Sequence, residues 1–184
     1  MSYESIKYWN KRANPNNANA TTKIEAHYLK PFLKDKFNLL DFGAGIGRTF
    51  ELYKDMDQVT GLDFSEIYET QARASAKANG LNYEHIIHNV HSEPLPFENG
   101  TFEAGVALCV LLHAKPGKEV KTILTELARV CDKVLVVSYY GQGQKLAAHN
   151  FEHDYETLID ELGLTMYEAA IDLSYNQITF VYGR

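Results

Sequence analysis

Three glycines spaced two residues apart, Gly43, Gly45 and Gly47, directly follow an apolar run of the sequence. Glycine adopts backbone conformations that other residues avoid, and a bend without side chains lets a ligand approach the backbone closely. A dinucleotide-binding turn would carry its third glycine at position 48, which is Arg48, and the chain has no Walker-type loop with its lysine. The bend favours a ligand without a pyrophosphate. A tight strand-to-helix connection that binds nothing is the alternative.

Two carboxylates stand close to this bend in the sequence. Asp41 lies inside the end of the apolar run, where packing alone would rarely place an acid. Asp63 ends the next apolar run, twenty residues beyond Gly43, where a carboxylate can accept hydrogen bonds from both hydroxyls of a ribose. The alternative is that Asp63 helps to cap a helix that starts near Ser65. Together, the bend and Asp63 indicate a site for a nucleoside.

The elements that position these residues alternate along the chain. Apolar runs of strand length are separated by segments of helical period, which predicts parallel strands joined by crossover helices. The last two runs are joined by a turn too short for a parallel crossover, so we expect an antiparallel hairpin at the sheet edge. The predicted strands are 37–42, 58–64, 83–88, 102–112, 132–140, 165–173 and 177–183, and the predicted helices are 48–56, 65–80, 118–130 and 154–163.

Composition narrows the classes of partner. The chain has 184 residues with a formal charge of −6, and it has no cluster of five or more basic residues, which disfavours nucleic acid as a partner. Cys109 and Cys131 lie in apolar surroundings without the spacing of a zinc or redox pair, so we expect reduced thiols. No apolar run approaches the ~20 residues of a membrane span. We expect a cytoplasmic monomer or homodimer with no membrane partner.

Four motifs, in this order and at this spacing, resemble those of the class I S-adenosylmethionine-dependent methyltransferases over about residues 37–184. They are LLDFGAGIGR, VTGLDFS, SEPLPFENGTFEAG and CVLLHA. The resemblance implies S-adenosylmethionine as the cofactor. It also implies an α/β fold, a Rossmann-like three-layer sandwich whose seven-stranded sheet has the order 3-2-1-4-5-7-6 with strand 7 antiparallel. That antiparallel strand agrees with the hairpin predicted from the residues.

The resemblance also implies roles for individual residues. His91 and Ser92 stand where the family commonly has an Asp that accepts from the adenine amino group, so a neutral His nitrogen, Asn89 or a backbone carbonyl would take that role. Cys109 and Val110 border the sulfonium and the methionine end. The first motif surrounds the amino-acid part of the cofactor, and the second binds ribose and adenine. The residues of these two motifs are Asp41, Gly43, Ala44 and Gly45, then Asp63 and Phe64.

The N-terminal residues are expected to cover the bound cofactor. Residues 1–20 are predicted to form a lid segment with an Asn-rich hinge at 13–20, ahead of a single methyltransferase domain over 21–184. Tyr8, Trp9 and Arg12 resemble a short aromatic-and-Arg opening of several methyltransferase branches, in which the Arg pairs with the methionine carboxylate. A helix simply docked by Trp9 is the alternative.

Few catalytic side chains are needed, because methyl transfer from a sulfonium mainly requires alignment and exclusion of water. His113, expected at the end of the fourth strand, is the first candidate for a base, and a histidine bonded in the loop for structure is the alternative. Of Tyr139 and Tyr140, strand alternation sends one to each face, so one can orient the acceptor while the other belongs to the core. His149 and His153 could meet on one helical face, but with no third metal ligand we expect a solvated pair.

We therefore expect methyl transfer to oxygen or nitrogen of a small-molecule acceptor. The motif of DNA amino-methyltransferases after the fourth strand and the acidic ligands of metal-dependent catechol-type relatives are both missing from CVLLHA. Two alternatives stay open. One is a partner subunit that binds S-adenosylmethionine without catalysis, and the other is a macromolecule methyltransferase that needs a partner to complete its site.

Overall fold

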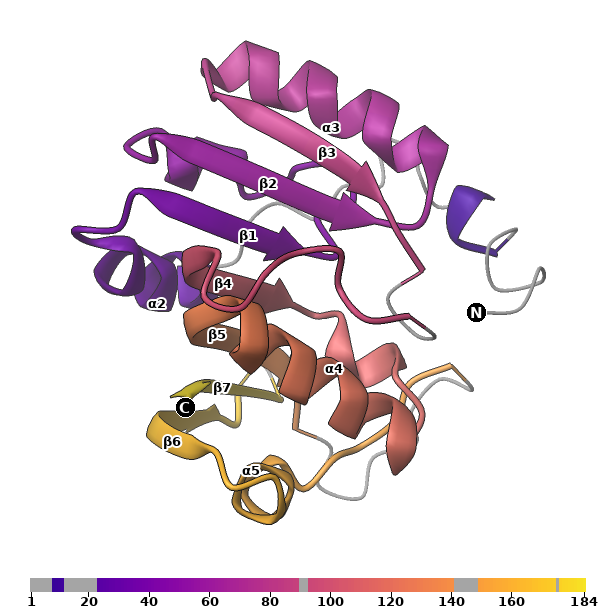
Figure 1. Ribbon diagram of the computed structural model, residues 1–184, viewed down its shortest axis with the longest axis vertical. Coiled ribbons are helices and arrows are strands. Elements are labelled where there is room, and N and C mark those ends of the chain that lie inside the picture. Colours follow the sequence, from indigo (N-terminus) through magenta and orange to yellow (C-terminus); the bar gives the residue numbers. More distant parts are fainter. Residues whose placement is uncertain (1–7, 12–22, 90–92, 141–148, 175) are drawn as a thin grey trace. The chain divides into compact units, whose positions relative to one another are not determined.

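The computed structural model describes residues 8–11, 23–89, 93–140, 149–174 and 176–184 (Figure 1). The contacts within the chain divide it into two compact units, Met1–Glu93 and Pro94–Arg184. The hinge predicted at 13–20 lies outside the described residues. That residues 21–184 form a single domain stays a prediction.

Seven strands form one sheet in the order β3-β2-β1-β4-β5-β7-β6. In the first unit, β1 (Asn38–Phe42), β2 (Gln58–Asp63) and β3 (Tyr83–Ile87) are parallel. In the second unit, β4 (Phe102–Leu108) and β5 (Cys131–Tyr139) are parallel, β7 (Gln177–Gly183) is antiparallel to β5, and β6 (Thr165–Asp172) pairs with β7 as a hairpin. The predicted Rossmann-like α/β fold, its strand order and its antiparallel last strand are confirmed.

Strands β1 and β2 contribute buried aliphatic side chains, such as Leu39, Leu40 and Leu62, to the core of the first unit. Helix α2 (Lys23–Leu33) precedes β1, and α3 (Glu66–Asn79) runs alongside β3 (Figure 1). Ser65 caps α3, since its Oγ accepts from the backbone N–H of Tyr68. Gly80 ends the helix with a φ of 71°, a conformation that glycine adopts without strain. This helix is therefore confirmed almost to the residue.

The predicted helix 48–56 is wrong in kind and in length. The structure has a 3₁₀ helix, η2 (Phe50–Tyr53), followed by turns. Phe50 and Tyr53 are both fully buried. Residues three apart eclipse one another in a 3₁₀ helix, so this geometry turns both rings into the core. The pattern of apolar residues could not separate that spacing from the 3.6-residue period of an α-helix.

The second unit packs α4 (Lys118–Val130) on β5, with Leu124 and Leu127 fully buried. Helix α5 (Tyr155–Glu161) begins after the capping residue Asp154, whose carboxylate accepts from the N–H of Thr157. The predicted strand 102–112 is too long, because β4 ends at Leu108 and a short 3₁₀ helix, η3 (Leu111–His113), follows.

Candidate functional site

The glycine bend after β1 keeps its N–H groups bonded within the first unit. The N–H groups of Gly43 and Ala44 donate to the Leu62 carbonyl at 2.8 and 3.2 Å, and the N–H of Gly45 donates to Asp63 Oδ2 at 3.0 Å. A phosphate would need such donors directed at itself. Because a carbonyl and a carboxylate already accept from them, the bend is not built for an anion, in keeping with the inference that the ligand lacks a pyrophosphate.

Two glycines of the bend serve different purposes. Both have left-handed φ angles, 54° at Gly45 and 74° at Gly47. A Cβ added to Gly47 would come within 2.5 Å of the Phe50 ring, so this glycine makes room for core packing. A Cβ added to Gly45 would meet only the Gly43 carbonyl, at 3.9 Å. The backbone at Gly45 is therefore not crowded by its neighbours, which is what a ligand-facing bend requires.

Asp63 joins the end of β2 to the bend. Its Oδ2 accepts from Gly45, and its Oδ1 accepts from the N–H of Phe64 at 2.7 Å. Burial raises the pKa of the Asp63 carboxyl to about 6, although backbone donors at Gly45, Phe64 and Ser65 act in the opposite direction. Ser65, and not Asp63, is the residue whose side chain caps α3. The geometry thus removes capping as the reason for an acid at position 63.

Asp41 lies at the end of β1 with 3% of its surface exposed. It is hydrogen-bonded to Tyr53, whose hydroxyl also accepts from Thr49 Oγ1 at 3.0 Å. Burial raises the pKa of Asp41 to about 7, while the Tyr53 bond and the charge of Arg48 lower it and the charge of Asp63 raises it further. This acid is therefore a buried group close to Asp63, and its contact with the cofactor stays a prediction.

A helical turn over residues 8–11 docks on Ser65 and Tyr68, at the start of α3. Ser65 Oγ donates to Asn10 Oδ1 at 2.7 Å, and Tyr68 Oη donates to the Trp9 carbonyl at 3.1 Å. The rings of Tyr8 and Trp9 meet edge to face, with centroids 5.1 Å apart. The N-terminal turn is thus fixed at the start of α3. Three predicted cofactor residues, Arg12, His91 and Ser92, lie outside the described residues.

The other predicted residues belong to the second unit, where the chain leaves β4. Cys109 has a φ of 58°, which is unusual for a residue other than glycine, and its N–H donates to the Val137 carbonyl at 2.7 Å. Val110 then leads into η3, whose third residue is His113. The expectation that His113 ends the fourth strand is wrong, because the turn at Cys109 stops the strand and places His113 on a 3₁₀ helix.

His149 and His153 do not lie on one helical face, since residues 149–154 are not helical. The Nε2 of His153 is 3.0 Å from the Leu111 carbonyl, and Nδ1 of His113 is 3.2 Å from the His149 carbonyl. His149 and His153 are both half-buried, so the prediction that they form a solvated pair is wrong. Among the described residues, no group of three or more potential ligands could hold a metal ion.

Tyr139 ends β5 opposite Gln177 of β7. Tyr139 and Tyr140 are both half-buried, so the expectation that one of them belongs to the core is wrong. Among the described tyrosines of this unit, the buried ones are instead Tyr155 and Tyr182. Tyr139 lies at the carboxyl end of its strand, which is the end where ligands bind in open α/β sheets.

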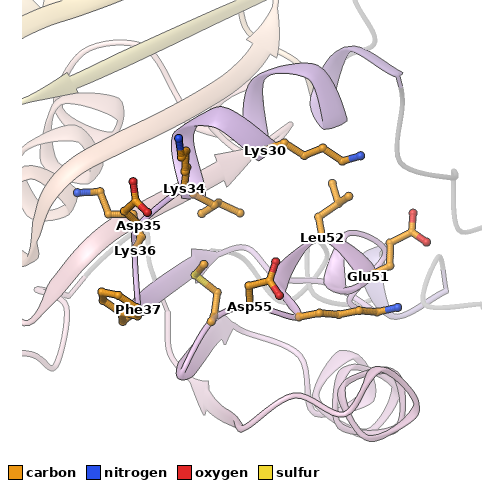
Figure 2. Close-up of a pocket in the computed structure, with 11 residues that line it drawn as sticks. Lys30, Lys34, Asp35, Lys36, Phe37, Glu51, Leu52 and Asp55 are labelled. Carbon is orange, nitrogen blue, oxygen red and sulfur yellow. The ribbon is translucent and has the colours of Figure 1, made fainter.

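A hollow of about 880 Å³ lies in the first unit between α2 and η2, near the start of β1 (Figure 2). Lysine and carboxylate side chains surround it, including Lys30, Lys34, Glu51 and Asp55. No predicted site residue lines it, and β1 carries the glycine bend at its other end. This hollow is therefore separate from the residues that could bind a nucleoside.

Sequence reasoning missed the residues that hold the predicted ones in place. Asn10 and Tyr68 dock the N-terminal turn by bonding the Ser65 hydroxyl and the Trp9 carbonyl, and neither Asn10 nor Tyr68 belongs to a predicted motif. Tyr53 bonds Asp41, yet it reads in the sequence as one more apolar position of a helix. The sequence predicts a solvated His153, whereas the structure bonds its ring to the Leu111 carbonyl. For Tyr53 and Tyr68 the only signal was a hydroxyl on an otherwise apolar side chain, and for Asn10 and His153 the sequence has no local signal.

Comparisons with known proteins identify the family of this chain. Residues 39–133 match the family model described as "Methyltransferase domain". A phosphatidylethanolamine N-methyltransferase of Cereibacter sphaeroides is 31% identical over 107 residues, which are 56% of this chain and 51% of that protein. The chain therefore spans about half the length of this curated relative.

Solved structures share the fold at lower identity. A chain from the Haloferax volcanii complex that contains the Trm112 methyltransferase activator superposes with a TM-score of 0.77 at 14% identity, covering 100% of this chain and 97% of the other. An S-adenosylmethionine-dependent methyltransferase from Aquifex aeolicus superposes with a TM-score of 0.71 at 18% identity, covering 99% and 98%.

Within the described residues, no helix has the length and apolar character needed to cross a bilayer. The family match covers just over half of the chain and begins in β1, so it includes both the glycine bend and the Asp63 carboxylate. The chain belongs to the methyltransferase domain family, in the class I S-adenosylmethionine-dependent superfamily that its motifs resemble.

Proposed function

We propose that this protein transfers the methyl group of S-adenosylmethionine to a nitrogen or oxygen of a small-molecule acceptor. The observation that carries this proposal is the bond between Gly45 N–H and Asp63 Oδ2, because it joins the bend after β1 and the end of β2 into one polar cradle. The bend is uncrowded at Gly45. Such a cradle suits a ribose, whose hydroxyls need acceptors, better than a phosphate, which needs donors.

We assign the ribose to Asp63. A carboxylate has about four lone-pair positions, and backbone donors at Gly45, Phe64 and Ser65 take three of them. About one position is then free for a ribose hydroxyl, and the second hydroxyl would share an oxygen with one of the backbone donors. The backbone of Gly43 and Ala44 and the nearby Asp41 would then border the amino-acid part of the cofactor.

The remaining cofactor contacts are assigned by position. Phe64 follows Asp63 directly and would lie beside the adenine. Tyr8 and Trp9 would cover the cofactor, since their turn is bonded to the start of α3. In the second unit, Cys109 and Val110 would border the sulfonium. Contacts from Arg12, His91 and Ser92 rest on the sequence motifs alone.

When bound, S-adenosylmethionine supplies a methyl group on a positively charged sulfur, which leaves as a neutral thioether. The protein's task is to align the acceptor, exclude water and receive a proton. We assign proton acceptance to His113 and orientation of the acceptor to Tyr139. The His113 imidazole would take up the proton that the acceptor loses on methylation, and Tyr139 would hold the acceptor in line with the methyl group.

The relative named as a phosphatidylethanolamine N-methyltransferase supports nitrogen as the acceptor atom to test first. The likeness to a chain from the Haloferax volcanii activator complex supports a second candidate, a methyltransferase that requires a protein partner. The two candidates differ in whether the isolated chain catalyses methyl transfer, so an experiment can separate them.

The test has two stages. Titration calorimetry with S-adenosylhomocysteine should show binding that Asp63→Ala weakens by about 10- to 100-fold, the effect of leaving partners of a charged hydrogen bond unpaired. Single-turnover reactions with methyl-labelled S-adenosylmethionine and a metabolite extract should then label a small molecule. Binding without a labelled product supports the partner-dependent candidate, and failure to bind either form of the cofactor contradicts both.

A further inference from the structure

Residues 149–153, here called the strap, bond to each residue of η3 in turn. The Phe151 N–H donates to the Leu112 carbonyl at 2.7 Å. On one side of this bond, His153 Nε2 lies 3.0 Å from the Leu111 carbonyl. On the other side, the His149 carbonyl lies 3.2 Å from Nδ1 of His113. The strap and η3 therefore pair in opposite directions, with a bond at every second strap residue.

These partners fix which ring nitrogens carry protons. A carbonyl oxygen can only accept a hydrogen bond, so the ring nitrogen facing it must be the donor. In neutral His113 the proton therefore lies on Nδ1, and Nε2 carries the lone pair. In neutral His153 the arrangement is reversed, with the proton on Nε2. The identity of the protonated nitrogen matters because only the other one can accept a proton.

The strap is anchored to the core of the second unit at His153. The ring of His153 packs against that of Tyr155, with centroids 5.5 Å apart. Tyr155 is buried, its hydroxyl lies 2.7 Å from Ser138 Oγ, and its ring packs on Phe180 at 4.7 Å. Burial lowers the pKa of His153, although bonds to the Leu111 and Ala114 backbone raise it. The lowered pKa favours the neutral ring, in which Nε2–H is the donor to the Leu111 carbonyl.

We propose that His153 is a positioning residue. By holding the strap on η3, it keeps the His149 carbonyl on Nδ1 of His113, so that Nε2 of His113 is the nitrogen that receives the acceptor's proton. This inference rests on the proposed function only in giving His113 the role of a base. The ring of His149 stacks on that of His113 at 5.5 Å, but the bond that selects the tautomer comes from its backbone.

The full chain labelled with ¹⁵N-histidine tests this directly. Long-range ¹H–¹⁵N correlation spectra distinguish the two neutral tautomers, and a pH of about 8 lies above the usual histidine pKa range. The His113 signals are assigned by their loss in His113→Gln. We expect His113 as a single tautomer with the proton on Nδ1. A wild-type spectrum with the proton on Nε2 of His113 would overturn the proposal.

Three variants test whether His153 fixes the tautomer of His113. His153→Leu removes the donor to Leu111, and we expect His113 to change from one tautomer to a mixture of both. His153→Gln keeps an N–H donor and should restore the single tautomer. His149→Ala removes the stacked ring but keeps the carbonyl, so it should leave the tautomer unchanged.

The proposal is overturned if His153→Leu leaves the His113 tautomer unchanged, or if His149→Ala alters it as much as His153→Leu does. Should His153→Leu fail to fold, His153→Ala is measured in its place, with the same expected mixture of tautomers, and an unchanged tautomer there overturns the proposal. The spectra require neither cofactor nor acceptor. A protein with the expected tautomers that ignores S-adenosylhomocysteine would contradict the proposed function alone.

Discussion

The cradle at β1 and β2 and the strap at η3 place functional side chains by different means. In the cradle, the ends of two parallel strands bring a glycine bend and Asp63 together, and the Gly45–Asp63 bond joins them directly. At η3, an irregular segment returns from far along the sequence, and His153 contacts Leu111 across 42 positions. Regular elements therefore position the predicted nucleoside site, whereas contacts distant in sequence position the predicted base.

The largest expected effect comes from removing the predicted base at η3. His113→Ala should lower turnover about 10²-fold or more, the usual contribution of a general base, while the affinity for S-adenosylhomocysteine is unchanged. Single-turnover kinetics with a labelled methyl group measure the first, and calorimetry measures the second. The matched control is His149→Ala, which removes a neighbouring histidine ring and should lower turnover less than His113→Ala does. Equal activity of His113→Ala and wild type across pH would make His113 structural.

The next effect concerns the buried acid of the cradle. Because the pKa of Asp41 is raised from 3.8 to about 7, its contribution to stability is full below about pH 4 and is lost as pH rises through about 7. Asp41→Asn keeps a group that can bond Tyr53 but does not titrate. The free energy of unfolding of wild type relative to this variant should fall by roughly 4 kcal/mol over that pH range.

Urea unfolding of both proteins at several pH values measures this difference. If the difference in free energy of unfolding between the two proteins were constant from pH 4 to pH 8, ionisation of Asp41 would not destabilise the fold, contrary to the burial of this carboxyl.

A pair of glycine variants separates packing from binding within the cradle. Gly47→Ala places a methyl against the Phe50 ring and strains a left-handed residue, so it should lower the melting temperature and cost about 2–4 kcal/mol of stability. Gly45→Ala meets only the strain, about 1–2 kcal/mol, yet it should weaken cofactor binding more. Melting curves and calorimetry on both proteins decide this. Equal losses of affinity in the two variants would leave Gly45 without a special role.

The smallest expected effect sharpens the role of the N-terminal turn. Asn10→Ala and Tyr68→Phe each remove one hydrogen bond that docks it, worth about 1 kcal/mol. If the turn covers the cofactor, each variant should weaken S-adenosylhomocysteine binding several-fold, and Thr70→Ala on the same helix should not. Unchanged affinity in both docking variants would make this turn a structural attachment only.

The sequence predicted the regular elements well because their signals are local. The hairpin of β6 and β7 follows from a turn too short for a crossover, and α3 from Ser65 and Gly80 at its ends. Asp63 could be identified because strands of known direction place their last residues at one edge of the sheet.

What the sequence did not predict depends on distant or irregular contacts. The stop of β4 at Cys109 is a single backbone angle inside an apolar run that otherwise favours a strand. The 3₁₀ form of η2 depends on burying Phe50 and Tyr53 together. The role of His153 depends on a carbonyl in another part of the chain, for which the sequence offers no local signal.

The central claim is that the Asp63 carboxylate binds the ribose of the methyl donor. A carboxylate accepts two hydroxyl hydrogen bonds best when it is charged, and the pKa of Asp63 is raised to about 6. Calorimetry with S-adenosylhomocysteine from pH 5 to pH 8 should show wild-type affinity that is constant above about pH 6 and falls as the pH drops below it. Asp63→Asn should bind more weakly and without that fall. Parallel pH profiles and equal affinities for the two proteins would contradict the account.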